Sequence, residues 1–254
     1  MGRAHEVRAK KMAATNAAKS ALYNRASKEI YLAAKSGVPD PSSNLSLRAA
    51  IEKYKGQGVT RDVIDRAIKK AQGADASTYV SGRYEGYGPG GIALIVDTLS
   101  DNDKRAFANV RAVFTHKGGH IGNTGSVTFM FQQLGDFIFE GKKEDVEKYA
   151  DALILEDVDL KNASYDDEDE TVEVTVGFKD FNKAHDVLEQ QGVTEFLKSE
   201  IAMVPNEKKH VEGDDRTKLI NFVNALNSLE DVQNVYTDAD FDVNNAEPEE
   251  EEKK

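Results

Sequence analysis

The chain has 254 residues, of which 39% are hydrophobic, and its 45 Asp and Glu residues outnumber 33 Lys and Arg residues to give a net charge of −12. This length can build one large domain or two to three small ones, each with a buried core. No apolar run approaches the roughly 20 residues that cross a bilayer, and the start of the chain lacks the apolar core of a signal peptide. The absence of Cys excludes disulfides, thiolate metal sites and cysteine nucleophiles. These features favour a cytoplasmic protein.

Charge is distributed unevenly along the chain. Residues 1–72 carry a net charge of +9, whereas residues 73–254 carry −21. A basic head on an acidic body indicates a polyanionic partner, with nucleic acid as the first candidate. The alternative is a lysine-rich helical surface that is merely solvated.

The first part of the chain predicts a basic arm and a helical domain. Residues 1–14 have many cations and few apolar anchors, so we expect a mobile arm. Residues 15–72 show apolar side chains at helical spacing, interrupted by glycine and proline at two places, which predicts three helices. Thr60 is the expected N-cap of the third helix. The cations of the first helix lie off its apolar stripe and are expected to face solvent: Lys19, Arg25, Lys28 and Lys35.

The rest of the chain predicts two α+β domains, after a polar linker over 73–81. The second domain has a buried strand at 92–96, a helix after 101–103 and an alternating strand through Val127, Phe129 and Phe131. Residues 133–204 read as a βαβαβ domain, and a helix at 214–228 and a strand at 232–236 are expected to return to the second domain. The predicted domains are therefore 82–132 plus 205–237, and an inserted domain over 133–204. Residues 238–254 read as an acidic disordered tail.

A glycine-rich stretch is the strongest local motif. It consists of Tyr84, Glu85, Gly86, Tyr87, Gly88, Pro89, Gly90 and Gly91. A phosphate-binding loop would continue into Gly-Lys-Ser/Thr and a helix, whereas an apolar strand follows here, so a hairpin or wide turn is expected. Its two tyrosines either stack on bases or pack against a neighbouring domain.

No pattern predicts an active site, a metal site or a cofactor. Glycines separate His116 from His120, and His185 and His210 read as structural or solvated. A hydrolase hypothesis would need Glu85, Asp97 and Asp101 to converge on a metal, but their spacing is not that of ligands. Two arginines of the helix after residue 103 are expected to face outward, where they either hold phosphate or pair with acids such as Glu85: Arg105 and Arg111.

Several motifs together resemble the YebC/PmpR family. They include the block from Arg83 to Gly91, the strand that follows it, the segment 125–127 and the helical motif 64–68, and the resemblance runs from Met1 to about Tyr236. It implies three domains, a cytoplasmic location, no catalysis and binding to promoter DNA as a transcriptional regulator. A related branch, which includes a mitochondrial translational activator, acts on the ribosome. Many members open with a Gly-His-Ser-Lys-Trp-like stretch, which this chain replaces with an aromatic-free basic one, so contacts of its arm would be mostly to phosphates.

The combined interpretation is an α+β protein with an N-terminal three-helix domain followed by two small α+β domains, the third inserted into the second. We expect a non-enzymatic, cofactor-free regulator of gene expression that binds promoter DNA, with rRNA or tRNA on the ribosome as the alternative partner. A protein-interaction scaffold stays open, and so does the oligomeric state, with a monomer slightly favoured. The expected nucleic-acid contacts are Arg3, His5, Arg8, Lys10, Lys11, Lys19, Arg25, Lys28, Arg105 and Arg111.

Overall fold

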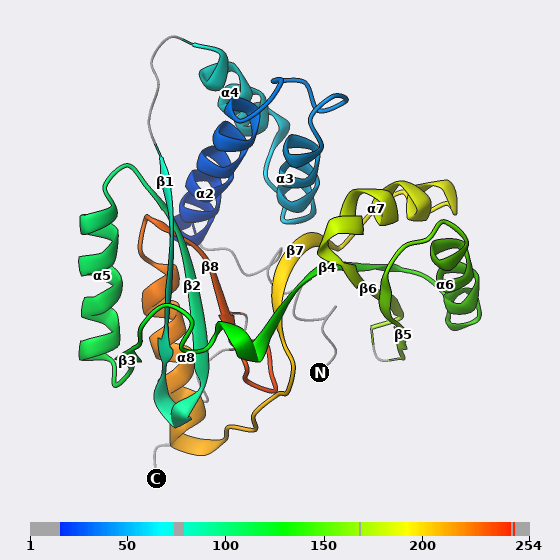
Figure 1. The fold of residues 1–254 in the computed structure, drawn as a ribbon. Coiled ribbons are helices and arrows are strands. Elements are labelled where there is room, and N and C mark those ends of the chain that lie inside the picture. The colour runs from blue at the N-terminus through cyan, green and yellow to red at the C-terminus, as the bar shows by residue number, and fades with distance from the viewer. Residues whose placement is uncertain (1–15, 74–78, 168, 245, 247–254) are drawn as a thin grey trace. The chain divides into compact units, whose positions relative to one another are not determined.

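The computed structural model describes residues 16–73, 79–167, 169–244 and 246, and only the backbone of residues 16–18 (Figure 1). The predicted arm over 1–14 lies outside these residues. The chain divides into two compact units: unit 1 spans residues 1–76 and 133–203, and unit 2 spans residues 77–132 and 204–254. Among the described residues, no helix is long and apolar enough to cross a membrane.

Unit 1 begins with three helices, as predicted. They are α2 (Asn16–Lys35), α3 (Leu45–Gly56) and α4 (Arg61–Gln72). Their core contains Ile30, Leu47 and Ile64, which are all buried. Asn44 caps α3, since its side-chain oxygen accepts a hydrogen bond from the Leu47 N–H at 3.0 Å. Thr60 does hold the N-cap position of α4, but its hydroxyl makes no capping hydrogen bond.

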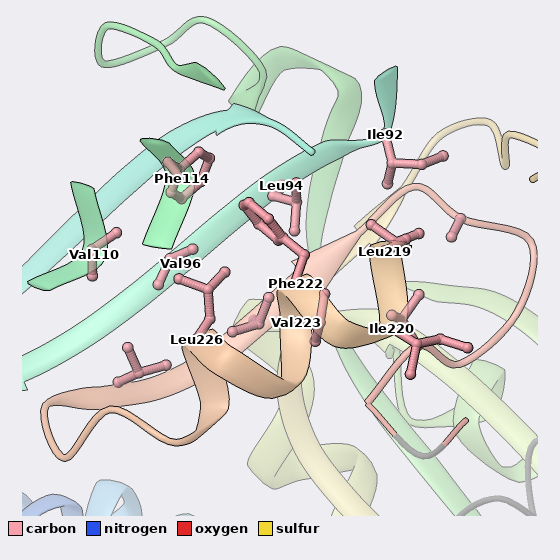
Figure 2. Packing of buried hydrophobic residues seen from close by; sticks show 14 of the residues in the cluster. Ile92, Leu94, Val96, Val110, Phe114, Leu219, Ile220, Phe222, Val223 and Leu226 are labelled. Atoms are coloured by element: carbon pink, nitrogen blue, oxygen red, sulfur yellow. The ribbon is translucent and has the colours of Figure 1, made fainter. Parts of the chain in front are cut away.

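Unit 2 contains a four-stranded sheet in the order β3-β1-β2-β8. Its strands are β1 (Val80–Tyr87), β2 (Ala93–Ser100), β3 (His120–Ile121) and β8 (Val232–Thr237), and its helices are α5 (Asp103–His116) and α8 (Gly213–Asn227). Figure 2 shows Leu94 and Val96 of β2 facing Phe222 of α8, whose ring meets Phe114 of α5 edge-on at 5.0 Å. Because β8 pairs antiparallel with β2, the end of the chain returns to this sheet as predicted.

The second sheet lies in residues inserted between β3 and α8. It has the order β5-β6-β4-β7. The elements are β4 (Phe131–Glu140), α6 (Val146–Leu155), β5 (Leu160–Asp166), β6 (Thr171–Gly177), α7 (Phe181–Gln190) and β7 (Lys198–Pro205). A β-α-β-β-α-β sequence with this strand order is the ferredoxin-like arrangement. The predicted βαβαβ order was wrong because it missed β5.

Strand β5 escaped prediction because of its place at the edge of the sheet. Its partly buried Ala163 and Tyr165 pack on the core, but they alternate with Asn162 and Ser164 and follow a run of acids. An edge strand pairs on one side only and therefore needs little apolar sequence. The antiparallel hydrogen-bond ladder with β6 stabilises this strand, although its sequence lacks a clear apolar alternation.

The predicted strand through Val127, Phe129 and Phe131 was also wrong. Residues Thr128–Met130 form a 3-10 helix, β4 starts only at Phe131, and the side chain of Phe129 is 72% exposed. The backbone N–H groups of Val127 and Thr128 are taken by the carboxylate of Glu85 and are thus unavailable for a strand ladder.

The predicted disordered tail begins too early. Residues 238–244 pack against the sheet and core of unit 2, to which they belong. The carboxylate of Asp238 accepts the Ala93 N–H at 2.8 Å, and Ala239 and Val243 are buried in the core. The prediction followed the acidic composition and gave no weight to the apolar residues within it, of which Ala239 and Val243 are buried and Phe241 packs against the core. Residues 247–254 lie outside the described part of the chain.

Candidate nucleic-acid interface

Three lysines at the C-terminal ends of α2 and α4 form what we call the lysine cluster: Lys35, Lys69 and Lys70. The ammonium groups of Lys35 and Lys70 lie 5.4 Å and 5.6 Å from the ring centroid of Tyr31, so they flank the same ring. All three lysines are exposed, and none forms an ion pair with an acid of the described residues. Cations at helix C-termini are favoured by the helix dipole, and these remain available to a phosphate group.

The predicted outward orientation of the cations on α2 is only partly right. Lys19 is exposed, with its ammonium 5.7 Å from the Tyr23 ring. Lys28 is only 9% exposed, and Arg25 is half-buried, where desolvation lowers the pKa of its guanidinium. Helix α2 packs against both α3 and α4, so it buries a wider arc than its one apolar stripe indicated. The long apolar stem of a lysine tolerates such burial.

The arginines of the helical region are engaged with carboxylates. Arg61 lies 3.6 Å from Asp65, and Arg66 lies 2.5 Å from Asp62, in both cases one helical turn apart. The free cations of this region are therefore lysines. A lysine is a point charge that meets phosphate well, whereas arginine is the side chain that reads a guanine edge through two parallel hydrogen bonds.

The predicted contacts of the N-terminal arm lie outside the described residues. They are Arg3, His5, Arg8, Lys10 and Lys11. Their part in binding stays a prediction.

The glycine-rich stretch forms a hairpin, as expected. Strands β1 and β2 pair antiparallel up to Tyr87 opposite Ala93, and Gly90 and Gly91 have φ angles of 71° and 66° in the turn. Left-handed backbone of this kind favours glycine. At Gly86, an added Cβ would lie 2.3 Å from the carbonyl oxygen of His120, so this glycine allows β3 to approach. The glycines thus serve the turn and the sheet.

Glu85 holds the loop that precedes β4. Its buried carboxylate accepts hydrogen bonds from the N–H groups of Gly125, Val127 and Thr128 at 2.7, 2.9 and 2.8 Å. Desolvation acts to raise the pKa of Glu85, but the three N–H donors outweigh it and the pKa is lowered. The sequence signal for this role was an acid that lies between tyrosine and glycine inside a strand.

The two arginines predicted on α5 have different surroundings. Arg105 contacts Asp231 at 3.0 Å and Asp101 at 2.8 Å, and its hydrogen bonds to them raise its pKa. Its acidic partners are thus the buried Asp231 and the exposed Asp101, and not Glu85. Arg111 is exposed and pairs with no acid in the described chain. Lys104 lies seven residues earlier on the same face of α5, so the two cations share that surface.

Tyr84 of the glycine-rich stretch and Asp97 of β2 also have local partners, whereas Tyr87 is partly exposed. The Tyr84 ring packs against Phe107 of α5 at 5.6 Å, while the Tyr87 side chain is 37% exposed. Asp97 forms a two-pronged ion pair with Arg83 at 2.7 and 2.9 Å. The acids of the hydrolase hypothesis are therefore each engaged separately and do not converge.

Comparison with known proteins identifies matches along nearly the whole chain. The sequence model of the TACO1/YebC protein N-terminal domain matches residues 3–74, and that of the TACO1/YebC second and third domain matches residues 79–239. A probable transcriptional regulatory protein of Mesoplasma florum is 48% identical and aligns with 94% of this chain and 99% of its own. Another from Pseudoalteromonas translucida is 43% identical over 95% of this chain and 100% of its own. The crystal structure of a conserved hypothetical protein from Aquifex aeolicus is similar with a TM-score of 0.76 at 29% identity, covering 89% of this chain and 92% of that one.

Proposed function

Because this chain belongs to the TACO1/YebC family, we propose that it is a regulator of gene expression that grips the phosphate backbone of DNA with its N-terminal helical region. The relatives named above as probable transcriptional regulatory proteins support promoter DNA as the partner. The observation that carries the proposal is the lysine cluster, whose charges no described acid neutralises.

The distribution of charge along the chain also supports binding through the N-terminal helical region. Residues 73–254 carry a net charge of −21 and are repelled by a polyphosphate, whereas residues 1–72 carry +9 and are attracted to it. This polarity steers the helical region, and not the acidic remainder, toward the partner. Lys19 and the arm residues from Arg3 to Lys11 would add to the grip of the lysine cluster.

The proposed role is non-enzymatic and cytoplasmic. What supports the first point is that the carboxylates nearest the glycine-rich stretch each hold a partner of their own: Glu85 holds backbone N–H groups, Asp97 holds Arg83 and Asp101 holds Arg105. None is left to act as an acid or base toward a substrate.

RNA on the ribosome is the second candidate partner, and one observation favours it. The exposed free cations of the helical region are lysines, whereas Arg61 and Arg66 are paired with Asp65 and Asp62. Such a surface meets phosphates without reading bases, which suits the backbone of a folded RNA as well as that of a duplex.

The test compares a charge-matched pair of triple variants. Lysine cluster residues are changed to Gln in K35Q/K69Q/K70Q, and three exposed lysines from other parts of the chain are changed in K179Q/K183Q/K208Q. Fluorescence anisotropy with a promoter duplex and its scrambled version, and co-sedimentation with ribosomes, are measured over a salt series. The proposal expects tighter binding to the promoter duplex and a loss of at least about fivefold in the cluster variant alone.

Equal affinity for promoter and scrambled duplexes, together with salt-sensitive ribosome binding, would contradict promoter DNA as the partner and support RNA on the ribosome instead. An equal loss in both triple variants would overturn the assignment of the grip to the lysine cluster, because the effect would then follow net charge and not position.

A further inference from the structure

A buried histidine on α7 lacks the hydrogen-bond partner that its burial calls for. The side chain of His185 is only 5% exposed, and both of its ring nitrogens are buried without a hydrogen bond to any described residue. Its ring stacks on Phe196, with centroids 4.6 Å apart, so it is held in place by aromatic packing. Buried polar atoms in proteins nearly always have a partner. The unpaired nitrogens therefore point to a ligand.

Two carboxylates lie beside this imidazole. His185 and Glu189 are one helical turn apart on the same face of α7, with 3.7 Å between Nδ1 and Oε2. This separation is too long for a hydrogen bond, yet it is close to the roughly 3.4 Å between two donors on one tetrahedral zinc ion. With Asp186 included, one ligand atom from each of the three residues lies within 4.8 Å of the others.

Asp186 is turned toward the site by a residue of α3. Adjacent positions on a helix do not face each other, so Asp186 would not meet His185 by helix geometry alone. The guanidinium of Arg48 contacts its Oδ1 at 2.5 Å and leaves Oδ2 without a partner among the described residues. A hydrogen bond to one oxygen of a carboxylate is the usual way in which a metal ligand is oriented.

The surroundings favour a cation. The three residues line an open surface depression of about 630 Å³ together with Arg48, Glu52 and Gln190. Its three carboxylates face one guanidinium in the lining and the ammonium of Lys55, which pairs with Glu52 at 2.9 Å, so one negative charge remains in excess. Asp186 and Glu189 are 46% and 55% exposed, so both can adjust to a metal that enters from solvent.

We propose that His185, Asp186 and Glu189 form a site for one divalent transition-metal ion, of the zinc or manganese class. An imidazole nitrogen with two carboxylates suits these ions better than calcium or magnesium, which prefer oxygen ligands alone. The signal in the sequence is His-Asp-x-x-Glu on a single helix. His185 was predicted to be structural or solvated because no second histidine lies at ligand spacing, and its neighbouring acids Asp186 and Glu189 were not considered as ligands.

Isothermal titration calorimetry of the untagged, chelator-treated full chain with ZnCl₂ and with MnCl₂ tests the site. The expected result is one ion of at least one metal per chain, with affinity lowered at least about tenfold in D186N and in E189Q. Both variants alter exposed side chains and keep their shape. The matched control is D240N, which changes an acid beside the exposed His210 and is expected to bind as the unmodified chain does.

A second measurement reports on the imidazole without replacing it. Nitrogen NMR of the His185 ring is expected to show a shift of the Nδ1 resonance when zinc is added, and no such shift in E189Q. The proposal is overturned if the full chain binds neither metal, if D186N and E189Q bind as well as the unmodified chain, or if D240N loses binding to the same extent.

Discussion

The helical region of unit 1 and the sheet of unit 2 illustrate two different uses of charged side chains, although each region contains both paired and exposed charges. In unit 2, charged side chains hold the fold together: Glu85 binds three backbone N–H groups, and Arg105 binds Asp231. In the helical region, Lys35, Lys69 and Lys70 are exposed and pair with no described acid. Charges of the first kind contribute to folding, while charges of the second kind are available to a partner.

This contrast explains why charge counts alone point to the helical region but do not distinguish its buried lysines from its exposed ones. Lys28 and Lys69 count equally in the sequence, yet one is buried and the other exposed. Substitutions can therefore separate the two classes: changes in paired charges should affect stability, and changes in free charges should affect binding.

The largest effect on stability is expected from Glu85→Gln. The change places an amide donor against three backbone N–H donors in a buried site and removes the charge that they bind, at a cost of about 2–3 kcal/mol in the free energy of unfolding. Urea denaturation measures this cost. Glu207→Gln, on an exposed carboxylate after β7, is the control and should change stability by less than about 0.5 kcal/mol.

The pH dependence gives Glu85 a second signature. Its folded-state pKa lies below the unfolded value of about 4.3, so its contribution is present above that pH and is lost as pH falls through the lower, folded-state pKa. Glu85→Gln should flatten this acid-induced loss. An unchanged acid profile in the variant would contradict the role assigned to the carboxylate.

The two arginines of α5 are expected to behave differently. Arg105→Ala removes an ion-pair partner from the buried Asp231 and should lower the melting temperature by several degrees. Arg111→Ala removes an exposed, unpaired cation and should leave melting nearly unchanged. Differential scanning fluorimetry decides this, and equal melting of the two variants would show that the ion pair contributes nothing.

Sequence periodicity predicted elements whose pattern is local. The run predicted at 92–96 lies mostly in strand β2, which continues to Ser100, and the cap expected near 101–103 is Asn102, whose side chain accepts the Arg105 N–H. It failed where a distant residue decides the structure. Glu85 fixes residues 125–128 from about forty positions away, and β5 exists because β6 pairs with it.

The exposure of the cations in the candidate interface could likewise be predicted only where it depends on residues close in sequence. Helical spacing identified the exposed Lys19 correctly, but it could not show that two neighbouring helices cover Lys28. The ion pairs of Arg61 with Asp65 and of Arg66 with Asp62 are different, because each spans one helical turn and its spacing is visible in the sequence. Whether a cation is exposed and unpaired depends on how the helices pack. The sequence alone predicts this only where the neighbouring side chains are close along the chain.

A smaller effect separates buried from exposed lysine. Lys28→Ala removes a buried stem and should cost about 1 kcal/mol of stability, without changing the salt dependence of nucleic-acid binding. Lys69→Ala should do the reverse, lowering affinity and salt dependence while stability stays within about 0.5 kcal/mol. If Lys28→Ala lowers affinity at unchanged stability, Lys28 contacts the nucleic acid after all.

The smallest effect concerns the segment 238–244. His210 lies between Asp240 and Glu212, whose hydrogen bonds and charges raise its pKa. Its stabilising contribution is complete below the unfolded pKa of about 6.5 and is lost as pH rises through the higher, folded-state pKa. Hydrogen exchange in 238–244, compared with His210→Gln at each pH, should show an added protection near pH 6 that fades in mildly alkaline solution. Equal protection in both proteins at each pH would contradict a stabilising role of His210 in the segment 238–244.

The salt dependence of binding tests the central claim most directly. The claim is that Lys35, Lys69 and Lys70 meet phosphates, and each phosphate contact contributes about 0.7–0.9 to the slope of log affinity against log salt concentration. The account predicts that K35Q/K69Q/K70Q makes this negative slope shallower, reducing its magnitude by about 2–3. The control variant K179Q/K183Q/K208Q, with the same loss of charge, is expected to leave the slope unchanged. Equal slopes for the unmodified chain and the lysine cluster variant would contradict it.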